Sequence, residues 1–433
     1  MNKIIHILIM VFVLQSCVQE EENLFGVSAS ERMQKTVAEY KELLTSPQNG
    51  WIAEYYPQKN HSVGGYVMFL KFNTAGTVTA NCEIATNVPA NTTDSSLYDV
   101  FAEQGPILSF STYNRVMHYF SEPSSSDVDG RAGDYEFVFM KVVSPDEIHL
   151  KGKKQGNKLV LRKNPDINPV VPNVYFDGVK KIADDVAKFG LFRLLVENKV
   201  IDSLVVSDRT MSGNSINVTF TYTDEGIRLY EPLIINGVTM LNFKWIPETG
   251  KYECTDSGVN AYFEGYFSSG FQLQYEDFIG EWEMQYNGRS TSSLSTATVQ
   301  ISIKQKYRSF LLSCKEIFSF PGIVLTYNPQ KGTISLISQR IEFISGGSNN
   351  IRVFAYGRSS GYYSTNIGSI GLDGIWNNDA NGKKQITFVD NKVWGTYKVD
   401  GILLQLYTDN IYLNNFTGNA GGHRFNNITL TKK

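Results

Sequence analysis

Cysteine, histidine and net charge are all scarce in this chain of 433 residues. Its four cysteines and five histidines show no CxxC or HExxH spacing, so no zinc motif is present. The formal net charge is -3, and no lysine- or arginine-rich stripe marks a nucleic-acid partner. A glycine-rich phosphate loop and a G-x-S-x-G nucleophile elbow are also missing. We therefore predict no metal, no cofactor and no nucleic-acid partner, and we expect a protein without catalytic activity.

Long apolar runs are absent too, because a membrane span needs roughly 20 apolar residues. The longest run, residues 4–14, follows a short basic start and fits the hydrophobic region of a signal peptide. A small residue then precedes a cysteine in Leu14-Gln15-Ser16-Cys17, which resembles the bacterial lipobox. We predict a signal peptide over residues 1–16 and lipidation at Cys17. The alternative is an ordinary signal peptide with an incidental cysteine.

An acidic segment follows the predicted anchor, in the order Gln19-Glu20-Glu21-Glu22. It resembles the surface-export signal of Bacteroidetes lipoproteins. A short charge run is otherwise a solvated, flexible tether. We predict a lipidated acidic tether over residues 17–27 that holds the protein on the outer membrane, facing the cell exterior.

The composition favours β-structure. Aromatic residues make up 13% of the chain and charged residues only 19%. Tyrosine, phenylalanine, valine, isoleucine and threonine suit pleated, half-buried surfaces. We predict a mainly β fold of antiparallel meanders, small barrels or sandwiches in two to three domains, with an N-terminal helix. The prolines of residues 164–172 indicate a linker, so the domain ranges are 28–164 (helix plus β), 165–274 (α+β) and 275–433 (β).

Local patterns place the main elements. Ser28 and Glu31 have the spacing of a capping box, and apolar residues at helical intervals predict a helix that ends near residue 46. A second helix is predicted over residues 177–189. Alternation or density of apolar residues predicts strands over residues 66–72 and 299–303, whereas residues 86–96 read as a polar loop.

Two short turns are predicted from dipeptides in which glycine follows asparagine or aspartate. Asn236-Gly237 is a strong hairpin signal. Asp400-Gly401 predicts a second hairpin, between strands at residues 394–397 and 402–406.

Three cysteines remain once Cys17 is lipidated: Cys82, Cys254 and Cys314. Because their number is odd, we expect them to be small buried apolar residues, and one disulfide is the alternative.

Aromatic residues in loops are the candidate binding residues. Tyr362 and Tyr363 lie in a stretch rich in glycine and serine, and Tyr55 and Tyr56 precede Pro57. Tyrosine presents a flat, rigid face to a glycan or a peptide at low entropic cost. The alternative for these residues is partial burial against neighbouring strands.

Acidic residues provide the competing interpretations. Glu281 and Glu283 flank Trp282 on one strand and point to one face, which suits either glycoside cleavage or a solvated surface. Four further acids in or beside loops suit calcium ligation or simple solvation: Asp94, Asp127, Asp129 and Asp134. We prefer the solvated interpretation for both groups, and a hydrolase or a purely structural subunit remains the alternative function.

A family resemblance covers most of the predicted mature chain. It rests on the segments Glu31-Arg32-Met33, Gly50-Trp51, Gly64-Gly65-Tyr66, residues 71–78, Gly133-Asp134-Tyr135-Glu136-Phe137 and residues 150–157. These resemble uncharacterised Bacteroidetes lipoproteins that carry the domain of unknown function numbered 4302. The resemblance implies an accessory part of an outer-membrane nutrient-uptake complex. Separately, Gly280-Glu281-Trp282 resembles the opening of lipocalin-like barrels, in which the tryptophan is a packing residue.

Overall fold

The protein is described by a computed structural model covering residues 27–58, 63–83, 92–123, 130–197, 199–207, 209–288, 293–318, 320–344, 348–410 and 413–433. The predicted signal segment, Cys17 and nearly all of the acidic tether lie outside these ranges. The chain divides into two compact units, with the boundary after Asn173. Among the described residues, no helix is both long and apolar enough to cross a membrane.

Helix α2 (Ala29–Thr45) opens the first unit as the sequence predicts. Ser28 caps it: its hydroxyl accepts the Glu31 N–H, and the Glu31 carboxylate accepts the Ser28 N–H. The apolar stripe of the helix ends at Leu44, which is buried. Trp51, the first residue of the strand that follows, stabilises this end of the helix, because its indole N–H donates to the Leu44 carbonyl at 2.8 Å.

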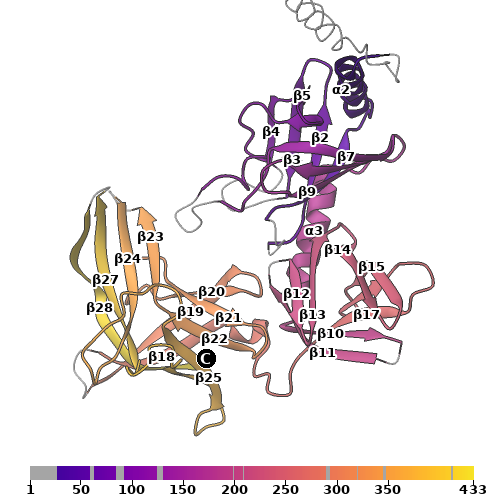
Figure 1. Cartoon of the computed structure of the whole chain (residues 1–433). Helices are drawn as coiled ribbons and strands as arrows, with labels where there is room; N and C mark the ends of the chain where they lie inside the picture. Colours follow the sequence, from indigo (N-terminus) through magenta and orange to yellow (C-terminus); the bar gives the residue numbers. More distant parts are fainter. Residues whose placement is uncertain are drawn as a thin grey trace, which may run out of the picture. The chain divides into compact units, whose positions relative to one another are not determined.

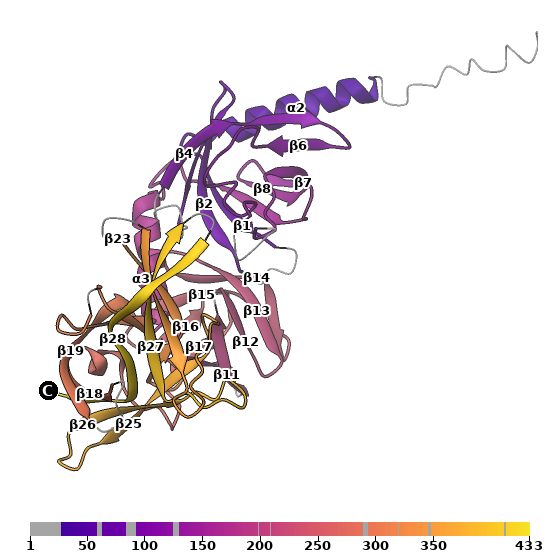
Figure 2. The same cartoon turned by 90° about the vertical axis from the view of Figure 1, so that its left-hand side faces the viewer.

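A nine-stranded antiparallel sheet forms the rest of the first unit, in the order β4-β3-β2-β1-β9-β8-β7-β6-β5 (Figure 1). Tyr98 alone separates the two edge strands β4 and β5, so one run of chain borders both ends of the sheet. Figure 2 shows α2 running alongside this sheet. The strands are β1 (Trp51–Tyr56), β2 (Tyr66–Phe72), β3 (Thr77–Cys82), β4 (Thr92–Leu97), β5 (Asp99–Ala102), β6 (Pro106–Ser109), β7 (Glu136–Ser144), β8 (Glu147–Gly152) and β9 (Lys158–Lys163).

The second unit begins with helix α3 (Pro172–Val186) and a closed eight-stranded barrel. The predicted hairpin at Asn236-Gly237 is confirmed, since Ile235 pairs with Val238 and both turn residues have positive φ. The barrel closes where β10 pairs with β17. Its strands are β10 (Leu191–Val196), β11 (Lys199–Ser207), β12 (Thr210–Gly213), β13 (Ile216–Tyr222), β14 (Gly226–Ile235), β15 (Val238–Ile246), β16 (Lys251–Cys254) and β17 (Ala261–Tyr266).

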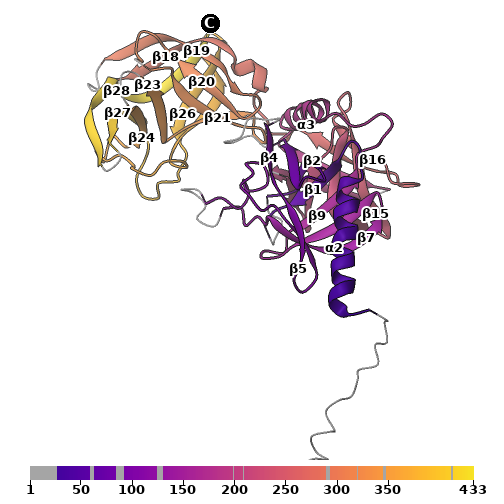
Figure 3. The same cartoon turned by 90° about the horizontal axis from the view of Figure 1, so that it is seen from above.

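An eleven-stranded sheet follows the 3-10 helix η1 (Tyr275–Phe278). The end of β28 pairs with both β18 and β26, which closes eight of the strands into a ring (Figure 3). The strands are β18 (Gly280–Asn287), β19 (Leu294–Gln305), β20 (Ser309–Ser313), β21 (Ile323–Asn328), β22 (Thr333–Ile337), β23 (Gln339–Ile344), β24 (Ser348–Tyr356), β25 (Gly371–Asn378), β26 (Lys384–Asp390), β27 (Gly401–Asn410) and β28 (Leu413–Lys432).

Strands β23, β24 and β27 extend the sheet beyond the ring. Their inner faces join the core of the ring, which contains Trp282 among its fully buried residues. The packing role predicted for Trp282 is therefore confirmed. The mainly β fold with an N-terminal helix is confirmed as well, whereas the division into three domains stays a prediction.

The expected second helix is confirmed with shifted bounds, and two other expected elements are wrong. Helix α3 begins at Pro172, before the predicted start, because proline at the first helical position loses no hydrogen bond. Strand β4 occupies the end of the expected polar loop, where its threonines suit a strand. Residues 394–397 form a turn rather than a strand, so no tight hairpin forms at Asp400.

In the described part of the chain, Cys82, Cys254 and Cys314 form no disulfide. Cys82 and Cys314 are buried, as predicted for small apolar residues, while Cys254 is half-buried.

Candidate functional site

Tyr55 and Tyr56 are not loop residues, which corrects the sequence prediction. Both lie in β1 and are at most 1% exposed. The Tyr55 hydroxyl donates to the Asn157 side-chain oxygen at 2.7 Å and accepts the Asp134 N–H at the same distance. Burial raises the pKa of Tyr55 well above its ordinary value. These rings are committed to the core because strand β1 pairs on both sides, and they have no face to offer a ligand.

Tyr362 and Tyr363 do reach the surface, with 60% and 40% of each residue exposed. They contact different rings. Tyr362 lies against Tyr397, with ring centroids 5.5 Å apart, and Tyr363 lies against Phe354 at 5.2 Å. The two neighbouring tyrosines therefore belong to separate aromatic clusters.

The cluster around Tyr362 joins two loops that the sequence does not connect. Tyr397, which is 42% exposed, also contacts Trp394 at 5.2 Å between centroids. Trp394 is half-buried and packs against the core of the C-terminal sheet. We call Tyr362, Trp394 and Tyr397 the aromatic patch. The sequence predicts only Tyr362 of this patch, because the pattern of residues 394–397 indicates a strand and not a loop.

Backbone hydrogen bonds hold the first loop of the patch in place. Gly361 N–H donates to the Gly357 carbonyl at 2.8 Å, and Gly357 N–H donates to the Tyr362 carbonyl at 3.0 Å. The positive φ of Gly361 suits a residue without Cβ. A Cβ on Gly357 would lie 2.5 Å from the Lys398 carbonyl oxygen, so glycine is needed where the two loops approach.

Asp400 ties the two loops together. Its carboxylate accepts the Arg358 N–H at 2.8 Å, and its own N–H donates to the Tyr356 carbonyl at 3.1 Å. Its carbonyl accepts the Asn427 N–H from β28 at 2.9 Å. The patch is thus supported by a connected set of hydrogen bonds, which lowers the entropy lost when a ligand binds.

The cluster around Tyr363 lies on the outward face of β24 and β27. Phe354, Tyr356 and Leu403 are buried there as a small separate core. The Arg352 guanidinium stacks on the Tyr407 ring at 4.0 Å, and burial raises the pKa of Tyr407. This cluster stabilises the extension of the sheet and exposes less ring surface than the aromatic patch.

Asp134 and Asp94, two of the acids considered for calcium ligation, accept hydrogen bonds from backbone N–H groups. Asp134 is only 3% exposed, and its carboxylate accepts N–H groups from Lys154, Gln155 and Asn157. It closes a turn and is not a solvated acid, contrary to expectation. Asp94 lies in β4, and its carboxylate accepts the Arg115 N–H at 2.8 Å.

No group of three or more acidic, histidine or cysteine side chains suited to a metal occurs in the described part of the chain. Asp127 and Asp129 lie outside it. Glu281 is exposed, and Glu283 accepts a hydrogen bond from the Gln285 amide at 3.1 Å.

One pocket of about 280 Å³ lies in the first unit, between α2 and the turns beside β3 and β5. Two charged residues that line this pocket pair with each other, because the Lys41 ammonium lies 2.7 Å from the Asp99 carboxylate. The aromatic patch remains the stronger candidate, since its rings face solvent.

The fold defines a mainly β protein of antiparallel sheets, one of them a closed barrel. A family model described as a domain of unknown function (DUF4302) matches residues 21–247. This is more than half of the chain, and the protein belongs to the DUF4302 family. The domain family indicated by its motifs is thereby confirmed. A second model, DUF4987, also described as a domain of unknown function, matches residues 255–405.

No curated protein matches the chain. Among solved structures, two mutants of the vaccine antigen transferrin binding protein B from Haemophilus parasuis are similar. One is 10% identical, with 86% of this chain and 67% of the other covered, at a TM-score of 0.14. The other is 9% identical, with 89% and 76% covered, at a TM-score of 0.14. TM-scores this low support no argument about fold or function.

Proposed function

We propose that this protein is a surface lipoprotein of Bacteroidetes that captures a glycan without cleaving it, as an accessory part of an outer-membrane uptake system. The observation that carries the proposal is the exposed aromatic patch. Cys17 is the proposed lipid anchor, and the acidic tether is the proposed export signal.

The geometry of the patch suits a sugar. A pyranose ring has an apolar face of C–H groups and a polar rim of hydroxyls, so it needs flat rings edged by hydrogen-bonding groups. Tyr362 and Tyr397 meet at 74° between their ring planes, so the two ring faces point in different directions. Tyrosine rings combine apolar faces with a polar tip. The exposed residues Arg358 and Lys398 belong to the same two loops and supply further donors.

A binding screen tests the proposal. The mature chain from Gln19 is run through gels containing amylopectin, hydroxyethyl cellulose, xylan, galactomannan, pectin, glycol chitin or mucin, and sugar products are assayed in parallel. We expect retardation by at least one polysaccharide, without products. The double variant Tyr362→Ala/Tyr397→Ala should lose about tenfold or more in affinity, because both ring faces are removed.

The matched control is Ile303→Ala in β19, which also removes an exposed apolar side chain from the C-terminal sheet. Asn287 lies at the end of the β18–β19 hairpin that is linked to the Asp400 loop, because Asn427 donates hydrogen bonds to both Asn287 and Asp400. Ile303 lies at the opposite end of this hairpin and therefore away from the aromatic patch. This variant should bind as the wild type does. Release of products would replace the capture proposal with hydrolysis, and retardation by none of the polysaccharides would overturn the glycan proposal.

The anchor is tested separately in cells. Cys17→Ala should move the protein from the membrane fraction to the soluble fraction, since acyl chains contribute about 0.8 kcal/mol per buried methylene. Protease added to intact cells should degrade the wild type. Full protection would contradict surface display while leaving the binding proposal intact.

A further inference from the structure

Three aromatic rings form a second exposed group, in the first unit. His118 lies between Tyr135, with ring centroids 4.7 Å apart and nearly parallel planes, and Tyr113, at 5.3 Å. Tyr113 is 56% exposed and Tyr135 is 44% exposed. We call Tyr113, His118 and Tyr135 the N-terminal stack. Its two tyrosines turn about half of their surface to solvent.

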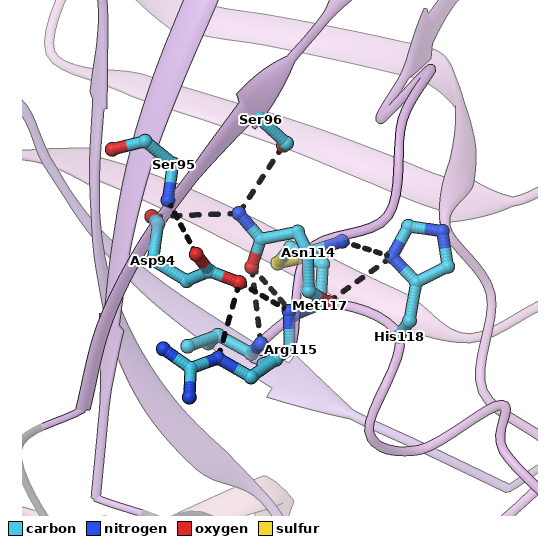
Figure 4. A network of polar contacts seen from close by, with 8 residues as sticks. Asp94, Ser95, Ser96, Asn114, Arg115, Met117 and His118 are labelled. Carbon is cyan, nitrogen blue, oxygen red and sulfur yellow. Dashed lines mark hydrogen bonds and ion pairs between the residues drawn. The ribbon is translucent and has the colours of Figure 1, made fainter.

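A buried asparagine positions the segment that carries the stack. Asn114 is fully buried, and its side-chain oxygen accepts the N–H groups of Val116 and Met117 at 3.0 and 3.2 Å. Its amide donates to the Ser96 hydroxyl at 3.2 Å, which links the segment to β4. Figure 4 shows this network, with the His118 ring at its edge and Nδ1 turned toward Asn114.

The middle ring of the stack is neutral at pH 7. His118 Nδ1 lies 3.1 Å from the Asn114 amide nitrogen and 3.2 Å from the Asn114 carbonyl oxygen, so it accepts the Asn114 N–H in one neutral tautomer and donates to the carbonyl in the other. Burial lowers the pKa of His118, and the nearby Glu122 carboxylate opposes this effect. Within the described residues, no hydrogen bond occupies Nε2. The stack therefore offers uncharged ring faces and, at Nε2, a ring nitrogen that donates or accepts a hydrogen bond according to the tautomer.

We propose that the N-terminal stack is a second sugar-binding surface of this protein. It goes beyond the proposed function, which concerns the aromatic patch of the other unit. The outer faces of Tyr113 and Tyr135 take the C–H face of a pyranose, while His118 Nε2 forms a hydrogen bond with a hydroxyl at its rim. The Glu122 carboxylate, which is near enough to raise the pKa of Tyr113, supplies an acceptor beside the same ring.

Two sugar sites on one chain have a consequence for polymers. Binding at the second site becomes intramolecular once the first site is occupied, so a long polysaccharide binds more tightly than a short oligosaccharide of the same sugar. A single site gives no such dependence beyond the length that it covers.

The test uses the mature chain from Gln19 and the same seven polysaccharides. Four proteins are compared: the wild type, the stack variant Tyr113→Ala/Tyr135→Ala, the patch variant Tyr362→Ala/Tyr397→Ala and the combination of all four substitutions. We expect the stack variant to bind a polymer about tenfold more weakly. The patch variant should keep residual binding, and the combined variant should lose it.

A control and a milder variant protect the test from folding defects. Met140→Ala removes another exposed side chain of the first unit, 60% exposed, and should leave binding unchanged. His118→Phe keeps three rings but removes the hydrogen-bonding Nε2, so it should bind severalfold more weakly while staying folded at the temperature of the binding assay.

The outcomes separate the two proposals. If the stack variant and His118→Phe bind as the wild type does, the second site is wrong and the patch proposal stands. If binding depends on the stack alone, the second site stands and the patch proposal is wrong. Binding of none of the seven polysaccharides overturns both.

Discussion

Removal of the Asn114 side chain should destabilise the first unit far more than its size suggests. In Asn114→Ala the N–H groups of Val116 and Met117 lose their acceptor, and the Ser96 hydroxyl loses a donor. A buried donor left unsatisfied costs about 1–3 kcal/mol. Partial hydration of the vacated space offsets some of this penalty. We expect a total loss of about 2–4 kcal/mol in the free energy of unfolding.

Calorimetry and hydrogen exchange together measure this loss. The transition of the first unit should shift down by about 5–15 °C, given a few degrees per kcal/mol for a unit of this size. The amides of Val116 and Met117 should lose protection against exchange, because their acceptor is gone. The transition of the second unit should stay in place, since the substitution lies outside that unit.

Arg115→Ala is the matched control from the adjacent position. The Arg115 side chain is 54% exposed, and its Nε lies 3.5 Å from the Asp94 carboxylate. Its backbone N–H, which donates to the same carboxylate, is kept. An exposed pair of this kind contributes at most about 1 kcal/mol. Equal losses from the two substitutions, or a loss below about 1 kcal/mol from Asn114→Ala, would refute the reasoning.

Three further predictions follow from buried groups. Trp282→Phe should lose about 2–4 kcal/mol in urea denaturation, because it leaves a cavity and an unpaired Phe278 carbonyl, whereas the half-buried Trp376→Phe should lose less than about 1 kcal/mol. Burial raises the pKa of Cys254 to about 11, so its alkylation at pH 8 should be about a hundredfold slower than that of a thiol with the ordinary pKa; equal rates would contradict this. Burial lowers the pKa of His118, so its contribution is complete above about pH 6.5 and is lost as the pH falls below that value. His118→Phe should therefore flatten the decline in stability between about pH 7 and pH 5.5, and an unchanged slope would show that other groups cause the decline.

The parts of the fold that could be predicted depend on local chemistry. The capping box at Ser28 and Glu31 satisfies backbone groups of its own helix, so nearby residues suffice to identify it. Asn236-Gly237 adopts the positive φ values of a tight hairpin for the same local reason. Alternation in residues 299–303 predicted part of β19, because one face of that strand is buried.

The errors arose where distant residues decide the structure. Tyr55 precedes a proline and looks like a loop residue, yet pairing with β2 and β9 places it in the core. Tyr362 was recognisable as an exposed tyrosine, but its partner Tyr397 lies 35 positions later in a different loop. Pairing of β24 with β27 and the hydrogen bonds of Asp400 bring these loops together, and no periodicity in the sequence predicts these long-range contacts.

Fluorescence of Trp394 tests the central claim most directly. Trp394 is half-buried at the aromatic patch, while Trp51 and Trp282 are fully buried in cores away from solvent. The mature chain is titrated with the polysaccharide that retards it most strongly, in parallel with Trp394→Phe. Our account predicts a saturable change in wild-type emission that is absent in Trp394→Phe. An identical change in both proteins, or none in either while binding persists, would contradict capture of a glycan at the aromatic patch.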